Sequence, residues 1–166
     1  MKEYIYLGKV VNTHGIKGEI RIKSDFLKKN RVFKKDFNLY FGNEKTKEKI
    51  NTYRVHKEYD MVTLNGIDNI NDVLKYKGKN VFVKREELNL SDNDYVLEDL
   101  IGLTVIEDEK TLGIIKDFMY NNGKVLLAVS SNKDFYIPYN EFFIKKVCLQ
   151  EKQIFVENAK DLILWE

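Results

Sequence analysis

A short segment near the N-terminus carries the residues whose types and spacing are best suited to binding chemistry. It reads NTHGIKGE over residues 12–19. Gly15 and Gly18 permit positive φ angles and the close approach of a partner's backbone. Lys17 lies between them, and the His14 ring can donate or accept a hydrogen bond. The pattern predicts a turn that presents these side chains to a ligand, unless the glycines serve only the geometry of a hairpin.

A basic stretch follows over residues 23–35, where Asp25 is the single acidic residue. Its cations are Lys23, Lys28, Lys29, Arg31, Lys34 and Lys35, with Phe26 and Phe33 interleaved. Such a loop can lie along phosphates and bind them through salt-dependent electrostatic attraction. Because lysine outnumbers arginine 24 to 4 in the chain, a solvated lysine-rich loop is the alternative interpretation.

The chain lacks the sequence motifs of catalytic or metal chemistry. Its two histidines and one cysteine do not have the spacing of a metal site, and no P-loop, dinucleotide-binding motif or serine nucleophile motif is present. We therefore expect no enzyme activity, no cofactor and no metal. Cys148 has no partner for an internal disulfide, and no apolar run is long enough to span a bilayer. These features predict a cytoplasmic protein without a signal peptide or membrane association.

Short strands separated by turn residues must position these segments. In the first half we expect strands over residues 4–11, 19–23, 38–41, 50–55, 60–64 and 81–83. In the second half we expect strands over residues 103–107, 113–119, 125–130, 135–137, 143–149 and 154–157. Between two of these, Asn122 and Gly123 form the dipeptide that most strongly indicates a tight hairpin.

One segment of the first half has a helical period instead. Ile70, Val73, Leu74 and Lys77 are spaced to share one face of a helix. Asn69 can cap the start of this helix, and Gly78 stands where a left-handed C-terminal residue belongs. The predicted fold class is thus mainly β, with two small β-barrels and one short helix in the first domain.

The distribution of charge also indicates two modules. Residues 1–88 carry 20 basic and 12 acidic side chains, whereas residues 89–166 carry 8 and 14. The net charges are therefore +8 and −6, although the whole chain has a net charge of only +2. The polar residues 86–94 are the predicted linker between domains 1–85 and 95–166. The apolar run over residues 95–102 that follows is either core or a contact patch, and the same question applies to Phe142 and Phe143.

The sequence resembles the family of the ribosome maturation factor RimM. The segment HGIKGEIRI over residues 14–22 is similar to the N-terminal signature of that family. Further similar segments are residues 8–10, 66–68, 78–83, 99–102, 137–139 and 147–154. They occur in the family's order over nearly the whole chain, although Val96 stands where the family usually has a second aromatic residue. The resemblance implies that the second domain is a PRC-type β-barrel.

The resemblance implies a non-enzymatic assembly factor. Such a factor binds the immature 30S subunit at its head, assists small-subunit assembly and 16S rRNA processing, and contacts small-subunit ribosomal protein nineteen through its C-terminal region. We expect RNA or ribosome contact through His14, Gly15, Lys17, Gly18, Arg21 and Lys23, and protein contact through Tyr95, Val96, Leu97 and Tyr139. We also expect a monomer. The alternatives are a PRC-barrel interaction adaptor unrelated to ribosomes and an RNA-modifying barrel enzyme.

Overall fold

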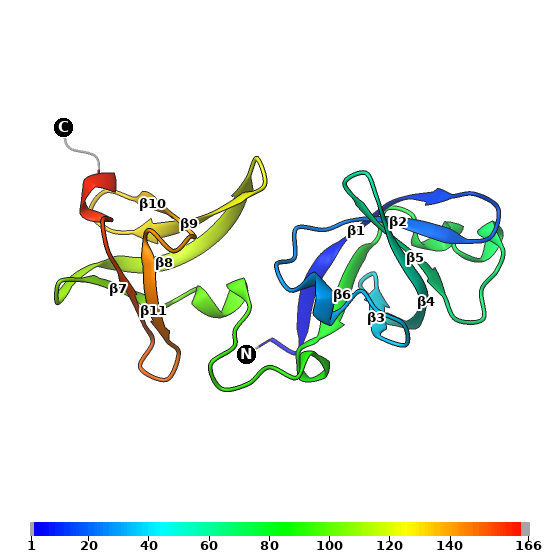
Figure 1. The fold of residues 1–166 in the computed structure, drawn as a ribbon, viewed down its shortest axis with the longest axis horizontal. Coiled ribbons are helices and arrows are strands. Elements are labelled where there is room, and N and C mark those ends of the chain that lie inside the picture. The colour runs from blue at the N-terminus through cyan, green and yellow to red at the C-terminus, as the bar shows by residue number, and fades with distance from the viewer. Residues whose placement is uncertain (1, 164–166) are drawn as a thin grey trace. The chain divides into compact units, whose positions relative to one another are not determined.

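A computed structural model of the protein describes residues 2–163 and divides the chain into two compact units, Met1–Ser91 and Asp92–Glu166 (Figure 1). Residues 164–166, which end the predicted second domain, lie outside the described residues. Residues 89–91 are uncharged, so the two units keep the net charges of +8 and −6. Every strand that the sequence predicts is present, although several are longer than predicted.

The first unit is a closed barrel of antiparallel strands. Its strands are β1 (Tyr4–His14), β2 (Glu19–Lys23), β3 (Asn38–Phe41), β4 (Thr46–His56), β5 (Tyr59–Leu64) and β6 (Asn80–Lys84). They follow the order β1-β2-β5-β4-β3-β6, and β6 pairs with β1 to close the barrel. Ile20 and Ile22 are fully buried while Lys23 is exposed, because successive side chains of a strand point to opposite faces. The basic side chains of β2 therefore lie on the outer face.

The predicted short helix consists of two 3₁₀ turns, η2 (Ile70–Asp72) and η3 (Leu74–Tyr76). The side chain of Asn69 accepts a hydrogen bond from the Asn71 amide at its start, and Gly78 has a φ angle of 82° after its end. Both predicted end residues are thus confirmed. The predicted helix face is wrong, since Val73 shares its buried face with Tyr76, whereas Leu74 is 48% exposed. A 3₁₀ turn has three residues, so positions i and i+3 share a face.

The start of the polar stretch that sequence analysis favours as a linker packs against the barrel. It forms the 3₁₀ turn η4 (Arg85–Leu88), in which Leu88 is buried. The Glu87 carboxylate accepts hydrogen bonds from the Tyr40 hydroxyl at 2.5 Å and from the side-chain amide of Asn38 at 3.0 Å. These contacts fasten residues 85–88 to β3.

The second unit is a six-stranded sheet with the order β10-β9-β8-β7-β12-β11. Its strands are β7 (Thr104–Glu107), β8 (Lys110–Asn121), β9 (Lys124–Ser130), β10 (Phe135–Pro138), β11 (Ile144–Cys148) and β12 (Gln153–Val156). Asn122 and Gly123 form the predicted two-residue hairpin between β8 and β9, and both have positive φ angles. β7 and β12 pair in parallel, and the intervening strands supply the long connection that parallel pairing requires.

Buried apolar side chains form one core in the second unit. The 3₁₀ turn η5 (Leu97–Leu100) contributes Leu97 and Leu100 to it, and Ala159 lies in this core just before the turn η6 (Lys160–Leu162). Most of the other core residues come from β7, β8, β9, β10 and β12. The part of the apolar run at η5 that sequence analysis left open is therefore largely core.

Candidate functional site

The β1–β2 hairpin carries the NTHGIKGE segment, and its glycines have φ angles of 74° at Gly15 and 91° at Gly18. The Ile70 amide donates a hydrogen bond of 3.0 Å to the Ile16 carbonyl oxygen, which ties the hairpin to η2. A Cβ atom at Gly18 would lie 3.1 Å from the Asn69 carbonyl oxygen, whereas a Cβ atom at Gly15 would meet nothing within 4 Å. The close backbone approach at Gly18 is therefore made by the chain's own η2 segment.

Five side chains from β1, β2, β4 and β5 form the histidine–arginine cluster, defined as His14, Arg21, Lys23, His56 and Tyr59. His14 Nδ1 lies 3.1 Å from Arg21 Nη2, and because a guanidinium only donates, Nδ1 is the acceptor. The Arg21 guanidinium carbon lies 5.1 Å from the Tyr59 ring centroid, and Lys23 Nζ lies 5.9 Å from it. The ring centroids of His14 and His56 are 5.8 Å apart. Arg21 therefore engages the Nδ1 atom of His14 and not its Nε2 atom.

Two carboxylates border this cluster. Glu19 accepts hydrogen bonds from Arg54 Nε at 2.9 Å and Nη2 at 2.7 Å. These bonds lower the pKa of Glu19 below its ordinary value, although partial burial opposes the shift. Glu58 pairs with Lys23 at 3.2 Å, with both side chains largely exposed. Partial burial, followed by the neighbouring cations, lowers the pKa of His56, so this ring is neutral at pH 7. The two cations of the cluster, Arg21 and Lys23, are thus matched in number by two carboxylates, and Arg54 adds a third cation at its border.

The structure brings together Arg21, Lys23 and His14 as the sequence predicts, and it adds two residues that sequence analysis did not select. His56 and Tyr59 pair at the β4–β5 hairpin and reach the cluster because β5 lies next to β2. The only local signal is a basic and aromatic hairpin, RVHKEY over residues 54–59. Its proximity to His14, more than forty residues earlier in the chain, depends on the strand order of the barrel. Lys17 is exposed on the hairpin loop beside the cluster.

Two cations of the basic stretch over residues 23–35 hold the barrel together. Lys29 Nζ lies 2.8 Å from a carboxylate oxygen of Asp60, a side chain that is only 2% exposed. The other oxygen of Asp60 accepts a hydrogen bond of 2.6 Å from the Tyr53 hydroxyl. Arg31 donates to the Leu88 carbonyl oxygen at 3.5 Å. Lys29 and Arg31 therefore stabilise the fold. Fewer cations of this loop are available to bind phosphates than its total charge indicates.

The four predicted partner-binding residues of the second unit differ in burial. Val96 and Leu97 are buried, at 4% and 6% exposed, and Leu97 is part of the core of the unit. Tyr95 and Tyr139 pack partly buried against the same core, and their hydroxyl groups are hydrogen-bonded to each other. Burial, and then this hydrogen bond, raises the pKa of Tyr139. The two tyrosines are therefore the less buried members of this set, and Leu97 belongs to the core against which they pack.

Sequence analysis also left open whether Phe142 and Phe143 belong to the core or to a contact patch. Phe142 is 61% exposed, whereas Phe143 packs partly buried against the core. The Asn140 side chain accepts hydrogen bonds from both amides, at 3.0 Å and 3.3 Å, and the Asn158 side chain donates to the Phe142 carbonyl oxygen at 3.1 Å. The exposed ring is therefore held on an ordered turn that follows Tyr139.

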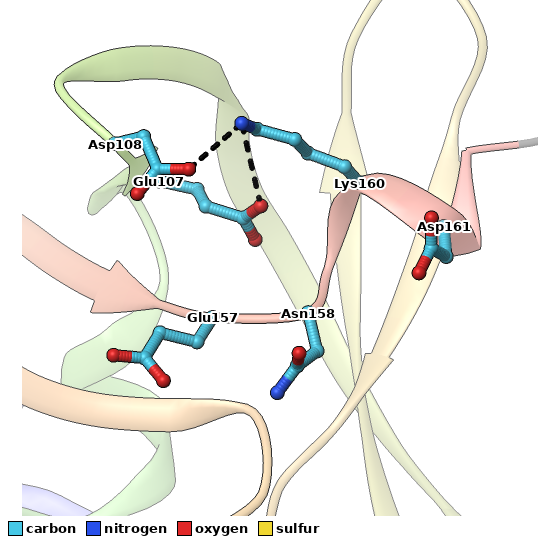
Figure 2. Close-up of a pocket in the computed structure, with 6 residues that line it drawn as sticks. All are labelled: Glu107, Asp108, Glu157, Asn158, Lys160 and Asp161. Atoms are coloured by element: carbon cyan, nitrogen blue, oxygen red, sulfur yellow. Dashed lines mark hydrogen bonds and ion pairs between the residues drawn. The ribbon is translucent and has the colours of Figure 1, made fainter.

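A pocket in the second unit is lined by Glu107, Asp108, Glu157, Asn158, Lys160 and Asp161 (Figure 2). Lys160 Nζ lies 2.8 Å from the Asp108 carboxylate and 3.9 Å from that of Glu107. Glu107 is buried and also accepts a hydrogen bond of 2.7 Å from the Ala159 amide, which fixes the start of η6. These contacts join the end of β7 to the start of η6, so the pocket stabilises the unit. Its carboxylates also contribute negative charge to the surface.

Two absences within residues 2–163 bear on other kinds of site. Within that range, no group of three or more His, Cys, Asp or Glu side chains is placed to hold a metal ion. The same residues include no helix that is long and apolar enough to cross a membrane.

Comparisons with known proteins cover both units. Residues 5–88 match the family model of the RimM N-terminal domain, and residues 97–162 match that of the RimM PRC barrel domain. A ribosome maturation factor RimM from an Exiguobacterium species is 32% identical over 97% of this chain and 97% of its own length. Another, from Staphylococcus aureus, is 32% identical over 96% of this chain and 98% of its own length. A solved structure of a 16S ribosomal RNA processing protein RimM from Pseudomonas aeruginosa aligns with 95% of this chain and 99% of its own, with 19% identity and a TM-score of 0.42.

Proposed function

Because the chain belongs to the RimM family, we propose that it is a ribosome maturation factor that binds the immature 30S subunit at its head and assists small-subunit assembly and 16S rRNA processing. The observation that carries this proposal is the match of both family domains, in order, over residues 5–88 and 97–162. The relatives that align over nearly their full lengths are named as ribosome maturation factors. The proposed role requires binding to an assembling particle rather than a catalytic step.

In this proposal the first barrel contacts RNA through the histidine–arginine cluster and the adjoining hairpin. Arg21 lies between an imidazole and an aromatic ring, so its guanidinium is held in place before any ligand arrives. Lys17 and Lys23 supply further exposed cations, and the His14 ring can donate a further hydrogen bond. Phosphate oxygens accept hydrogen bonds from such groups and attract their charge. Gly15 and Gly18 shape the hairpin that carries them.

The second unit contacts small-subunit ribosomal protein nineteen in this proposal. Its net charge of −6 suits a basic ribosomal protein, because opposite charges accelerate encounter. Tyr95 and Tyr139 provide the contact, since tyrosine is enriched among the residues that dominate binding at protein interfaces. Leu97 belongs to the core against which both rings pack.

Sucrose-gradient fractionation of a cell lysate tests the proposed function. The full-length protein is expected to migrate with free and immature small subunits and not with translating ribosomes. Migration away from all ribosomal fractions would refute the ribosomal role and would favour a PRC-barrel adaptor for some other protein.

A binding titration with purified ribosomal protein nineteen tests the second unit separately. Tyr95→Ala should weaken binding by about fivefold or more, as expected for an interface residue worth over 1 kcal/mol. Tyr136→Ala is the matched control, because Tyr136 is a 48% exposed tyrosine on β10. Thermal unfolding verifies that both variants are folded. Equal binding by the two variants would show that the contact lies elsewhere.

A further inference from the structure

We propose that the outer face of β1, β6 and β3 is a second RNA-binding surface, which takes single-stranded RNA by stacking bases on aromatic rings and pairing phosphates with lysines. We call it the aromatic face and define it as Tyr4, Tyr6, Tyr40, Lys45, Phe82 and Lys84. The inference rests on the proposed function only for the identity of the nucleic acid as RNA. Its residues are separate from those of the histidine–arginine cluster.

Closure of the barrel assembles the rings of this face. The strand β6 lies between β1 and β3 (Figure 1). Tyr6 pairs in register with Phe82 across β1 and β6, and Phe82 pairs with Tyr40 across β6 and β3. The Tyr6 and Phe82 rings meet edge to face with centroids 6.0 Å apart, and those of Tyr4 and Tyr40 do so at 5.3 Å. Tyr40 is buried and forms the floor of this face, whereas Tyr6 is 50% exposed. The Tyr6 ring therefore offers apolar surface to a ligand.

Two lysines lie among these rings. Lys45 Nζ is 4.2 Å from the Phe82 ring centroid and 5.5 Å from that of Tyr4. Lys84 Nζ is 5.7 Å from the Tyr4 centroid and 5.4 Å from that of Tyr40. Both ammonium groups are within the range of about 6 Å at which an aromatic ring attracts a cation. The rings thus hold two positive charges beside an exposed aromatic surface.

Several acidic side chains lie near this face. Burial and the nearby Asp25 raise the pKa of Tyr6, and Glu44, near Lys45, is already paired with Lys79 at 3.3 Å. Glu87 is engaged by the Tyr40 hydroxyl and the Asn38 amide. Glu3 lies 3.8 Å from Lys84, and its own side chain is 66% exposed. An exposed pair at that distance contributes little stability, so a phosphate can replace Glu3 as the partner of Lys84.

The chemistry of this face favours single-stranded nucleic acid over a peptide. A closed barrel has no free strand edge to which an extended peptide could be added. Recognition must therefore use the outward side chains, which are aromatic rings interleaved with lysines. Single-strand binding proteins combine these two residue types, because every base can stack and every nucleotide carries a phosphate. A duplex keeps its bases stacked on one another and cannot use the rings.

Fluorescence anisotropy with a labelled oligouridine, and with a blunt RNA duplex of the same length, tests the inference on the full-length protein. Tyr6→Leu keeps apolar bulk but removes the aromatic surface, so it should weaken oligouridine binding by about tenfold. Tyr6→Phe should bind like the wild type. Duplex binding should be unchanged in both variants, because no base of a duplex stacks on the protein.

Two lysine variants provide a matched comparison. Lys45→Gln should weaken oligouridine binding several-fold. Lys75→Gln removes the same charge and a similar cation–π contact, with Tyr76 at 5.2 Å, but from η3, and it should have no effect.

Three outcomes would overturn the inference. They are unchanged oligouridine binding by Tyr6→Leu, an equal loss for the duplex, and an equal loss in Lys75→Gln and Lys45→Gln. Absence of oligouridine binding by the wild type would also overturn it, whereas the proposed function is judged separately by migration with small subunits.

Discussion

Replacing Arg21 by glutamine removes the central charge of the histidine–arginine cluster. Arg21 is held by His14 at 3.1 Å and by the Tyr59 ring, and no acidic side chain among residues 2–163 forms an ion pair with it. Its guanidinium is therefore ready to bind a phosphate. A hydrogen bond that involves a charged group is worth about 1.5 kcal/mol at the lower end, so Arg21→Gln should weaken RNA binding by about tenfold at low salt.

The salt dependence of binding measures the same contact in a different way. Each cation that meets a phosphate of a single strand contributes about 0.7 to the slope of log affinity against log salt concentration. Arg21→Gln should make that slope shallower by about 0.7. The loss of affinity between about 50 and 200 mM salt then falls by a factor of about 2.6. Anisotropy titrations with a labelled single-stranded RNA at several salt concentrations give both quantities.

Arg54→Gln is the matched control for this prediction. Arg54 lies on β4, which β5 separates from β2. Both of its hydrogen bonds reach Glu19, so its guanidinium must leave that carboxylate before it can bind a phosphate. Its removal should leave the slope unchanged. If Arg21→Gln leaves the slope unchanged, or if both variants change it equally, the cluster does not present Arg21 to phosphates and the reasoning fails.

Three further predictions concern the fold that carries these surfaces. Gly15→Ala should lower the free energy of unfolding by about 1 kcal/mol because of the positive φ angle alone. Gly18→Ala should lower it further, because its Cβ atom would also lie 3.1 Å from a carbonyl oxygen. Equal losses of the two variants in urea unfolding would contradict this. Leu97→Ala should lower the free energy of unfolding by about 2–5 kcal/mol, and an unchanged melting temperature would show that this side chain is not in the core. Because Arg54 lowers the pKa of Glu19, their pair stabilises the barrel above the pKa of an unfolded glutamate and is lost as the pH falls through the lower folded value. The stability difference between wild type and Arg54→Gln should therefore shrink on acidification, and a growing difference would count against the assignment.

Local sequence patterns predicted the strands and several turns correctly. Alternation placed Ile20 and Ile22 in the core, and the dipeptide of Asn122 and Gly123 identified a hairpin. Alternation and turn chemistry are properties of neighbouring residues, so one sequence is enough to read them. The helical face was wrong because a periodicity of three to four residues does not distinguish a 3₁₀ turn from an α-helix over so short a segment.

The candidate sites were only partly predictable, because their completion depends on residues far apart in the chain. The hairpin with His14 and the cations of β2 were visible in the sequence. The burial of Leu97 was not visible in the sequence, because an apolar residue after a polar linker is equally typical of a core and of a contact patch. The cations of the basic stretch could not be told apart from the sequence. In the structure, Lys29 forms an ion pair with the buried side chain of Asp60.

The sequence by itself determined that this protein is mainly β, that its charge is divided between a basic and an acidic half, and that its segments resemble those of RimM. Only the tertiary structure decided which charges remain available and which rings share a face. Tyr6, Phe82 and Tyr40 are far apart in the chain, and they meet because barrel closure places β6 between β1 and β3. Strand register and closure are long-range properties, which no local periodicity encodes.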